Sequence, residues 1–303
     1  MQRSATHPFE CPARRSPSRA WVVALIAINL SWFAPITTAD EFLGAVEVDA
    51  KSNYSHYKVY RKGPLRSLVF IRDNGDEALQ SQMDMQQPHD LRIHYNRFMF
   101  ASYALRPTPQ KIAIIGLGGG SMVHFLKKHD PELNIDIVEI DPAIVSVAEQ
   151  YFGVKSAANI NIIVADGVTH LEKTGEKYDV IYMDAFLKPS AATDSSGVPL
   201  ATRTAEFYQM IQKKLRPDGL VAFNLNPHSK VRDDIAAIRN AFPQVYIFEL
   251  PRLLLLFARG YVVLASTQSM RETPQTLTAK LKDADRRFNT PYSFEQMVNR
   301  LEQ

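Results

Sequence analysis

Cysteine and tryptophan are almost absent from this chain of 303 residues, and the few that occur lie close to its start. The single cysteine is Cys11, and the two tryptophans are Trp21 and Trp32. Residues 40–303 therefore contain no thiol. This excludes a disulfide, a thiolate nucleophile and a cysteine metal site from that part of the chain.

Long hydrophobic runs are also missing, because the apolar stretch at residues 20–33 is shorter than the ~20 residues that a membrane-spanning helix needs. A basic stretch that ends at Arg19 precedes it, and small residues up to Ala39 follow it. This order is typical of a cleaved targeting segment. We therefore expect residues 1–39 to direct export to the periplasm, with no stable membrane insertion after cleavage. The alternatives are an anchor over residues 20–36 and a cytoplasmic protein.

The expected location can be tested by N-terminal sequencing of protein recovered from fractionated cells. We expect a chain that begins near Asp40, in the soluble fraction outside the cytoplasm. The reason is compositional, because the leader alone holds the charge excess, both tryptophans and the cysteine. An intact Met1 in the cytoplasmic fraction would contradict this prediction.

An excess of charge of one sign is the third feature that the main part of the chain lacks. The whole sequence has 35 Lys and Arg against 32 Asp and Glu, for a net charge of +3. Residues 1–39 hold four arginines and one glutamate, which leaves 31 basic and 31 acidic side chains in the remainder. A neutral remainder gives no reason to expect a nucleic-acid-binding surface.

The most informative pattern is an apolar run at residues 111–115 that ends in glycines. These glycines are Gly116, Gly118 and Gly120. A second apolar run closes with Glu139, and a carboxylate ~20 residues after such glycines can accept hydrogen bonds from both hydroxyls of a ribose. Ser121 stands where the dinucleotide fingerprint has its third glycine. The spacing therefore favours a nucleoside with a sulfonium or thioether over one with a pyrophosphate, although NAD is not excluded.

Strand-like and helical segments alternate from this turn onward, which predicts an α/β fold with a doubly wound, mostly parallel sheet. The expected strands are residues 111–115, 135–140, 160–164, 178–183 and 220–225, with 245–250 and 261–265 as closing strands. The expected helices are residues 122–129, 143–152, 168–171, 204–215 and 231–241.

The segment before the glycine turn reads differently. Residues 42–85 show short strands with a hairpin signal at Asn74-Gly75, and residues 88–105 show helical spacing. We therefore predict four segments: a leader over residues 1–39, a small β-rich domain with a linking helix over 40–108, a nucleoside-binding domain over 109–268, and a polar helical tail over 269–303.

Ligands of doubly wound sheets bind at the carboxyl ends of the strands. The residues expected there are Gly116–Gly120, Glu139, Asp141, Asp166, Gly167, Asp184, Asn224 and Asn226. Asp166 could accept from an adenine amino group, and Gly167 would leave room for the ring. Asp184 should point into the same crevice, unless it only caps the next segment. Asp179 begins its strand at the far end, where we expect a structural role.

No metal site is expected. His124 and His129 lie five residues apart on one expected helix and face different directions, which does not suit a shared metal ion.

The ordered motifs IIGLGGG, VEID, ADG, YDVIYMDAF and LRPDGLVAFNL resemble the spermidine synthase (polyamine aminopropyltransferase) family and its relatives with the class I methyltransferase Rossmann-like fold. The likeness covers roughly residues 46–266. In that family, decarboxylated S-adenosylmethionine donates an aminopropyl group to a diamine. The resemblance implies that Glu139 holds the ribose, Asp166 the adenine and the glycine turn the rest of the donor. It also places Gln80 and Tyr95 on the substrate side.

Two positions depart from the family pattern. Gly119 stands where the family has an aspartate that grips the amine of the donor, and Leu187 stands where it has the aspartate that deprotonates the attacking amine. Asp184 matches the first aspartate of that second motif and is the candidate catalytic residue. A general base typically contributes ~10²–10⁴ in rate, so efficient aminopropyl transfer is not expected.

Three functions follow from this reading. The first is a spermidine synthase-like transferase that binds S-adenosylmethionine, its decarboxylated form or methylthioadenosine. The second is a methyltransferase on an unknown acceptor, with Asp184 orienting the nucleophile. The third is a non-catalytic nucleoside- or polyamine-binding protein. The expected partners are a small-molecule nucleoside and a polyamine, and a homodimer is compatible with the sequence.

Overall fold

The computed structural model describes residues 42–186, 193, 197–251 and 260–302. The expected leader and Leu187 lie outside the described residues. Within the described part of the chain, no helix is both long and apolar enough to cross a membrane.

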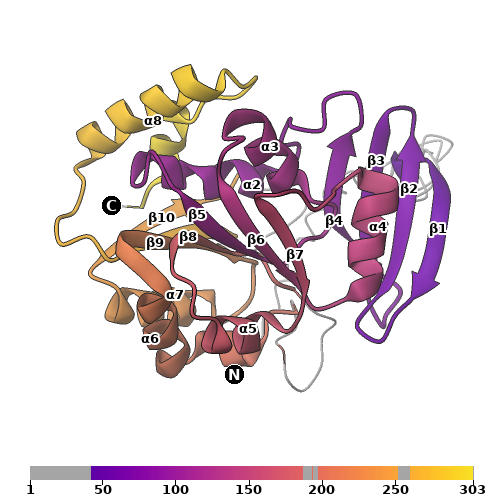
Figure 1. Ribbon diagram of the computed structural model, residues 1–303, viewed down its shortest axis with the longest axis horizontal. Helices are drawn as coiled ribbons and strands as arrows, with labels where there is room; N and C mark the ends of the chain where they lie inside the picture. The colour runs from indigo at the N-terminus through magenta and orange to yellow at the C-terminus, as the bar shows by residue number, and fades with distance from the viewer. Residues whose placement is uncertain (1–41, 187–192, 194–196, 252–259, 303) are drawn as a thin grey trace, which may run out of the picture. The chain divides into compact units, whose positions relative to one another are not determined.

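Four antiparallel strands form the first sheet, in the order β1-β2-β3-β4 (Figure 1). Their bounds are Ala45–Lys51 for β1, His56–Lys62 for β2, Leu65–Ile71 for β3 and Glu77–Asp84 for β4. Val59 and Leu68 on this sheet pack with Ile144 and Phe152 of helix α4 (Pro142–Phe152) in one buried cluster. The predicted β-rich domain is therefore joined to the following domain by a shared core.

Seven strands form the second sheet, in the order β10-β11-β9-β8-β5-β6-β7. Their bounds are Lys111–Ile115 for β5, Asn134–Glu139 for β6, Ile160–Val164 for β7, Tyr178–Met183 for β8, Leu215–Leu225 for β9, Gln244–Glu249 for β10 and Tyr261–Ser266 for β11. The strands from β9 to β7 pair in parallel, and β11 pairs antiparallel with both of its neighbours. The predicted mostly parallel sheet is confirmed.

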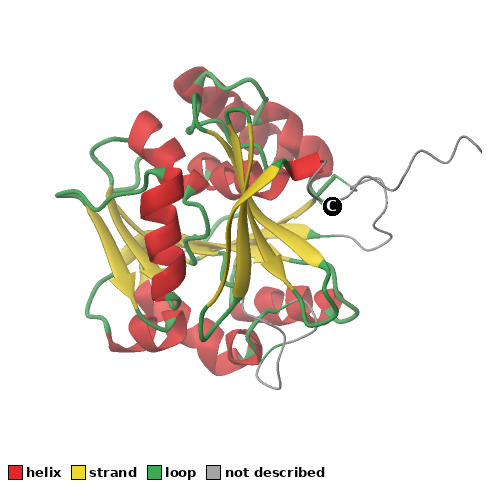
Figure 2. Cartoon of the chain, turned by 90° about the vertical axis from the view of Figure 1, so that its right-hand side faces the viewer, coloured by secondary structure: helices red, strands yellow, loops and turns green. Residues whose placement is uncertain are grey.

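Helices cover both faces of this sheet (Figure 2). One layer contains α2 (His94–Met99), η2 (Phe100–Ala104), α3 (Ser121–His129), α8 (Pro274–Phe288) and η4 (Glu295–Arg300), and the other contains α5 (Gly167–Lys173), α6 (Ala205–Lys214) and α7 (Val231–Ala241). Alternate residues of β5 face the two layers, with Ile112 and Ile114 in one core and Ala113 and Ile115 in the other. A strand buried on both faces reads as a continuous apolar run, which is why the sequence located it.

Two predicted boundaries are wrong by several residues. The helix expected from residue 88 begins only at His94, because residues before it form turns in which the Asp90 N–H donates to the carbonyl of Gln87. The strand expected from residue 220 begins at Leu215, which pairs with Tyr178 across a shift in register. The predicted polar tail forms helix α8, which buries one apolar stripe in the core of the second sheet.

Candidate functional site

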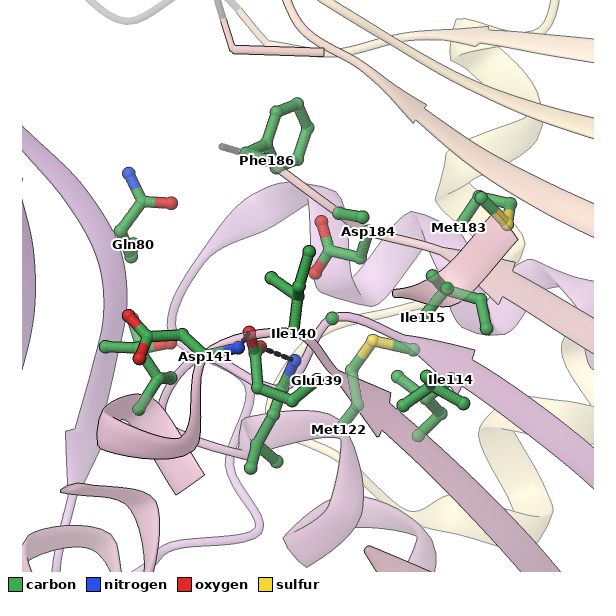
Figure 3. A pocket seen from close by; sticks show the side chains of 18 of the residues that line it. Gln80, Ile114, Ile115, Met122, Glu139, Ile140, Asp141, Met183, Asp184 and Phe186 are labelled. Carbon is green, nitrogen blue, oxygen red and sulfur yellow. Dashed lines mark hydrogen bonds between the residues drawn. The ribbon is translucent and has the colours of Figure 1, made fainter. Parts of the chain in front are cut away.

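A cleft opens at the carboxyl ends of β5, β6, β7 and β8, where the sequence placed the site (Figure 3). It holds about 1110 Å³ of space, open mouth included. Strand β4 of the first sheet contributes Gln80 and Ser81 to the wall of the cleft, and the turn between β1 and β2 contributes Tyr54. Helix α2 contributes Tyr95.

The glycine turn after β5 forms the floor of the cleft. Gly116 has a φ of 99°, and a Cβ atom there would lie 2.3 Å from the carbonyl oxygen of Asp184. No other residue type fits such a position without moving the backbone. Gly118 and Gly120 also have positive φ angles, of 54° and 73°. The turn therefore needs its glycines whether or not a ligand is bound.

Glu139 closes β6 beneath the turn and is 8% exposed. Its carboxylate accepts the N–H of Leu117 and the N–H of Asp141, each at 2.9 Å. Burial raises the pKa of Glu139, and these two backbone donors offset part of that effect. The carboxylate is thereby fixed at the cleft wall (Figure 3), and its remaining lone pairs are available to a ligand.

Asp166 and Gly167 lie at the end of β7 and line the cleft as predicted. Asp166 also accepts the N–H of Thr169 at 2.8 Å and caps the N-terminus of helix α5. A Cβ atom on Gly167 would lie 2.3 Å from Cγ2 of Ile115. Packing against β5 therefore requires a glycine there, beyond any room that it leaves for a base.

Asp184 follows β8, and the two described residues directly after it, Ala185 and Phe186, are not helical. Its Oδ1 accepts from Nδ2 of Asn224 at 2.8 Å, and its Oδ2 accepts from the hydroxyl of Tyr95 at 2.9 Å. Burial raises the pKa of Asp184 to about 7, against the lowering effect of these two donors and with a further rise from the nearby Glu139. A carboxyl group with this pKa can take up or release a proton near neutral pH.

Gln80 and Tyr95, predicted on the substrate side, both line the cleft. Gln80 extends from β4 on the opposite side of the cleft from Asp184 and Phe186 (Figure 3). Most of the residues predicted at the strand ends line this cleft, but Gly119, Asn224 and Asn226 are not among its described lining residues. Leu187 lies outside the described residues.

Two contacts of the site were missed by the sequence analysis. Oδ2 of Asp141 accepts from the hydroxyls of Ser52 at 2.5 Å and Ser55 at 2.9 Å, which ties the turn between β1 and β2 to the start of α4. The hydroxyl of Ser81 accepts the N–H of Gly119 at 2.8 Å. These hydrogen bonds join the first sheet and its β1–β2 turn to the domain of the second sheet.

The charge of the cleft has one sign. Its described lining contains four carboxylates and no lysine, arginine or histidine: Glu139, Asp141, Asp166 and Asp184. Within the described ranges, no group of three or more metal-ligating side chains occurs. The described part of the cleft therefore suits a cationic ligand, and its described lining holds no basic side chain to neutralise the charges of a pyrophosphate.

Comparison with known proteins identifies the family. The model of the spermine/spermidine synthase domain matches residues 96–256. The polyamine aminopropyltransferase of Vibrio vulnificus is 30% identical over 237 residues, which cover 76% of this chain and 75% of that protein. The fold and site thus define an α/β protein with a cleft at the carboxyl ends of its parallel strands, and the chain belongs to the spermine/spermidine synthase family.

Methyltransferases are also among its relatives. The human eEF1A lysine and N-terminal methyltransferase is 29% identical over 227 residues, which cover 69% of this chain and 32% of that protein. The fold matches a spermidine synthase solved with the transition state analogue AdoDATO, with a TM-score of 0.65, 19% identity and 86% of each chain covered. It also matches human methyltransferase-like protein 13 in complex with SAH, with a TM-score of 0.58, 24% identity, and 66% of this chain and 95% of that chain covered.

Proposed function

We propose that this protein is a transferase that uses a nucleoside of the S-adenosylmethionine type as its donor. The observation that carries the proposal is the charge of the cleft, which has four carboxylates and no basic side chain among its described lining residues. A sulfonium is a cation, and a site of this charge attracts it.

The order of the strands supports a direction for the donor. Asp166, Glu139, the glycine turn and Asp184 follow β7, β6, β5 and β8, and the sheet places β7, β6, β5 and β8 side by side in that order. An extended nucleoside would therefore place its base near Asp166 and its ribose near Glu139. Its sulfur would then lie between the glycine turn and Asp184.

Asp184 is the candidate proton acceptor of the transfer. A nucleophile on the acceptor attacks a carbon bound to the sulfur, the carbon–sulfur bond breaks, and its electron pair stays on the sulfur of a neutral thioether. The nucleophile loses a proton, which the carboxylate of Asp184 can take because its pKa of about 7 leaves it partly ionised at neutral pH. Tyr95 and Asn224 hold the two oxygens of that carboxylate in place.

An aminopropyl group is the first candidate for the group that is transferred, and a methyl group is the second. Gly119 offers no carboxylate to the ammonium at the end of an aminopropyl chain. A Cβ atom there would lie 2.9 Å from Cβ of Ser81, so the first sheet occupies the space that an acidic side chain would need. The methyltransferases among the relatives of the chain favour the same reading.

The binding proposal predicts a measurable loss on Glu139→Gln. Methylthioadenosine should bind this variant at least about tenfold more weakly than wild type, because a charged hydrogen-bond partner of the ribose is worth ~1.5–3 kcal/mol. Calorimetry at pH 8 gives both affinities. Glu149→Gln, an exposed change on α4, is the matched control and should bind like wild type. Equal affinities for Glu139→Gln and wild type would refute the placement of the ribose.

A further inference from the structure

Asn224 closes β9 and is buried beside Asp184, with 6% of its surface exposed. Its Nδ2 donates to Oδ1 of Asp184 at 2.8 Å, while its own Oδ1 has no hydrogen-bond partner among the described residues. A buried amide oxygen without a partner destabilises a fold. An asparagine here is therefore unfavourable for packing, and its one contact is the bond that it gives to Asp184.

The carboxylate of Asp184 is held from two sides. Asn224 reaches Oδ1 from the neighbouring strand β9, and the hydroxyl of Tyr95 reaches Oδ2 from helix α2 at 2.9 Å. One donor on each oxygen restricts rotation of the carboxylate plane, and donors to the charged form favour that form over the acid.

We infer that Asn224 is a positioning residue, which holds the carboxylate of Asp184 oriented toward the cleft and keeps it available as a proton acceptor. The inference deepens the proposed function and rests on it for the role of Asp184. The bond between Asn224 and Asp184 itself does not depend on which donor the protein uses.

Few other described groups affect the pKa of Asp184. The titratable groups that face it within the described residues are Tyr95 on α2 and Glu139 at the end of β6. Glu139 raises the pKa of Asp184 by charge repulsion, as burial does, while Asn224 and Tyr95 lower it. Loss of the Asn224 donor should therefore raise that pKa.

The first measurement is the titration of Asp184, followed by the ¹³C NMR signal of its carboxyl carbon and assigned with Asp184→Asn. Asn224→Ala should move the midpoint upward by about one pH unit or more, the effect expected from losing one hydrogen bond to a charged group. Asn226→Ala, which changes an asparagine two residues after Asn224, is the matched control and should leave the midpoint of the Asp184 titration in place. An unchanged midpoint in Asn224→Ala would overturn the inference.

The second measurement connects the titration to the donor. The sulfur of S-adenosylmethionine is positively charged, and that of S-adenosylhomocysteine is neutral. The affinity for S-adenosylmethionine, divided by the affinity for S-adenosylhomocysteine, should therefore rise with pH as Asp184 ionises. In Asn224→Ala this rise should move to higher pH with the NMR midpoint. Tyr95→Phe should move it in the same direction, and the double variant should show about the sum of both shifts, since each donor serves a different oxygen.

The two measurements separate the possible failures. If the NMR midpoint moves but none of S-adenosylmethionine, S-adenosylhomocysteine and methylthioadenosine binds, the positioning role stands and the proposed function fails. If the nucleosides bind and the rise of the ratio does not follow the NMR midpoint, Asp184 does not face the sulfur and the inference is overturned. Asn224→Leu, which is close to asparagine in size and has no hydrogen-bond donor, repeats the test if Asn224→Ala does not fold.

Discussion

Purified protein supplied with decarboxylated S-adenosylmethionine and putrescine should form spermidine ~10²–10⁴-fold more slowly than the Vibrio vulnificus relative under the same conditions. Leu187 stands where the family carries the base that deprotonates the attacking amine, and Gly119 stands where it carries the carboxylate that grips the donor. A protonated amine is no nucleophile, so an amine that is not deprotonated reacts slowly. Mass spectrometry of the product at saturating substrate measures both rates.

Asp184 should carry whatever transfer remains. The base must be ionised, so the residual rate should rise as the pH passes the Asp184 pKa of about 7 and fall below it. The neutral fraction of putrescine also grows with pH. The variant Asp184→Asn separates the two effects, because only the part of the pH dependence of the rate that is due to Asp184 should disappear in it. Spermidine formation at the rate of the relative would contradict the prediction, and would show that Asp184 alone suffices as the base.

Restoring the missing carboxylate should not be simple. Cβ of an aspartate at position 119 would lie 2.9 Å from Cβ of Ser81 and 3.1 Å from a ring carbon of Phe152. The hydroxyl of Ser81 also accepts the N–H of Gly119. The departure at Gly119 is therefore accommodated by the residues of the first sheet and α4 around it.

The sequence was most informative where burial is nearly complete. Strands β5 and β8, which are buried along almost their whole length, have the bounds that the sequence predicted. Parallel strands buried on both faces appear as short continuous apolar runs, and turn residues mark their ends. The first part of β9 was missed, because Leu215 joins the sheet only through its pairing with Tyr178, which no local pattern reveals.

The same distinction holds for the site. Glu139, Asp166 and Asp184 could be placed because strand ends meet at one edge of a parallel sheet. The bonds that fix their neighbours could not, since Asp141 and Ser52 are 89 residues apart in the chain, and Asp184 and Asn224 are 40 apart. The cap at Asp166 had a local signal, an aspartate three residues before a helical N–H, but Asp166 was predicted only as a partner of the adenine.

Asp179 lies at the opposite end of β8 from the cleft, and we expect it to contribute to the stability of the fold. Its side chain is fully buried and accepts from Arg106 at 2.5 Å, from Arg216 at 2.9 Å, and from the N–H groups of Gln110 and Lys111 at 2.8 and 3.0 Å. These contacts join the segment before β5, β8 and β9 at one point. The expected structural role is borne out by this geometry.

Asp179→Ala should lower the free energy of unfolding by about 3 kcal/mol at pH 7, a large fraction of the ~5–15 kcal/mol that holds a typical domain folded. The change leaves two backbone donors and two guanidinium groups without their shared acceptor. Urea unfolding of residues 40–303 measures the difference. Asp283→Ala on α8, whose side chain is 63% exposed, is the matched control and should stay within ~0.5 kcal/mol of wild type.

The effect of Asp179→Ala should also depend on pH. Burial alone would raise the pKa of Asp179, but the N–H groups of Gln110 and Lys111 and the Arg106 guanidinium outweigh it and lower that pKa. A carboxyl group with a lowered folded-state pKa contributes its stability above its unfolded pKa of ~3.9, and loses it as the pH falls through the folded value. The difference in free energy of unfolding between wild type and Asp179→Ala should therefore have its full size at pH 7 and shrink only below pH ~3.9. A gap that stays constant down to pH ~2 would show that lost packing, and not the ionised carboxylate, accounts for the effect.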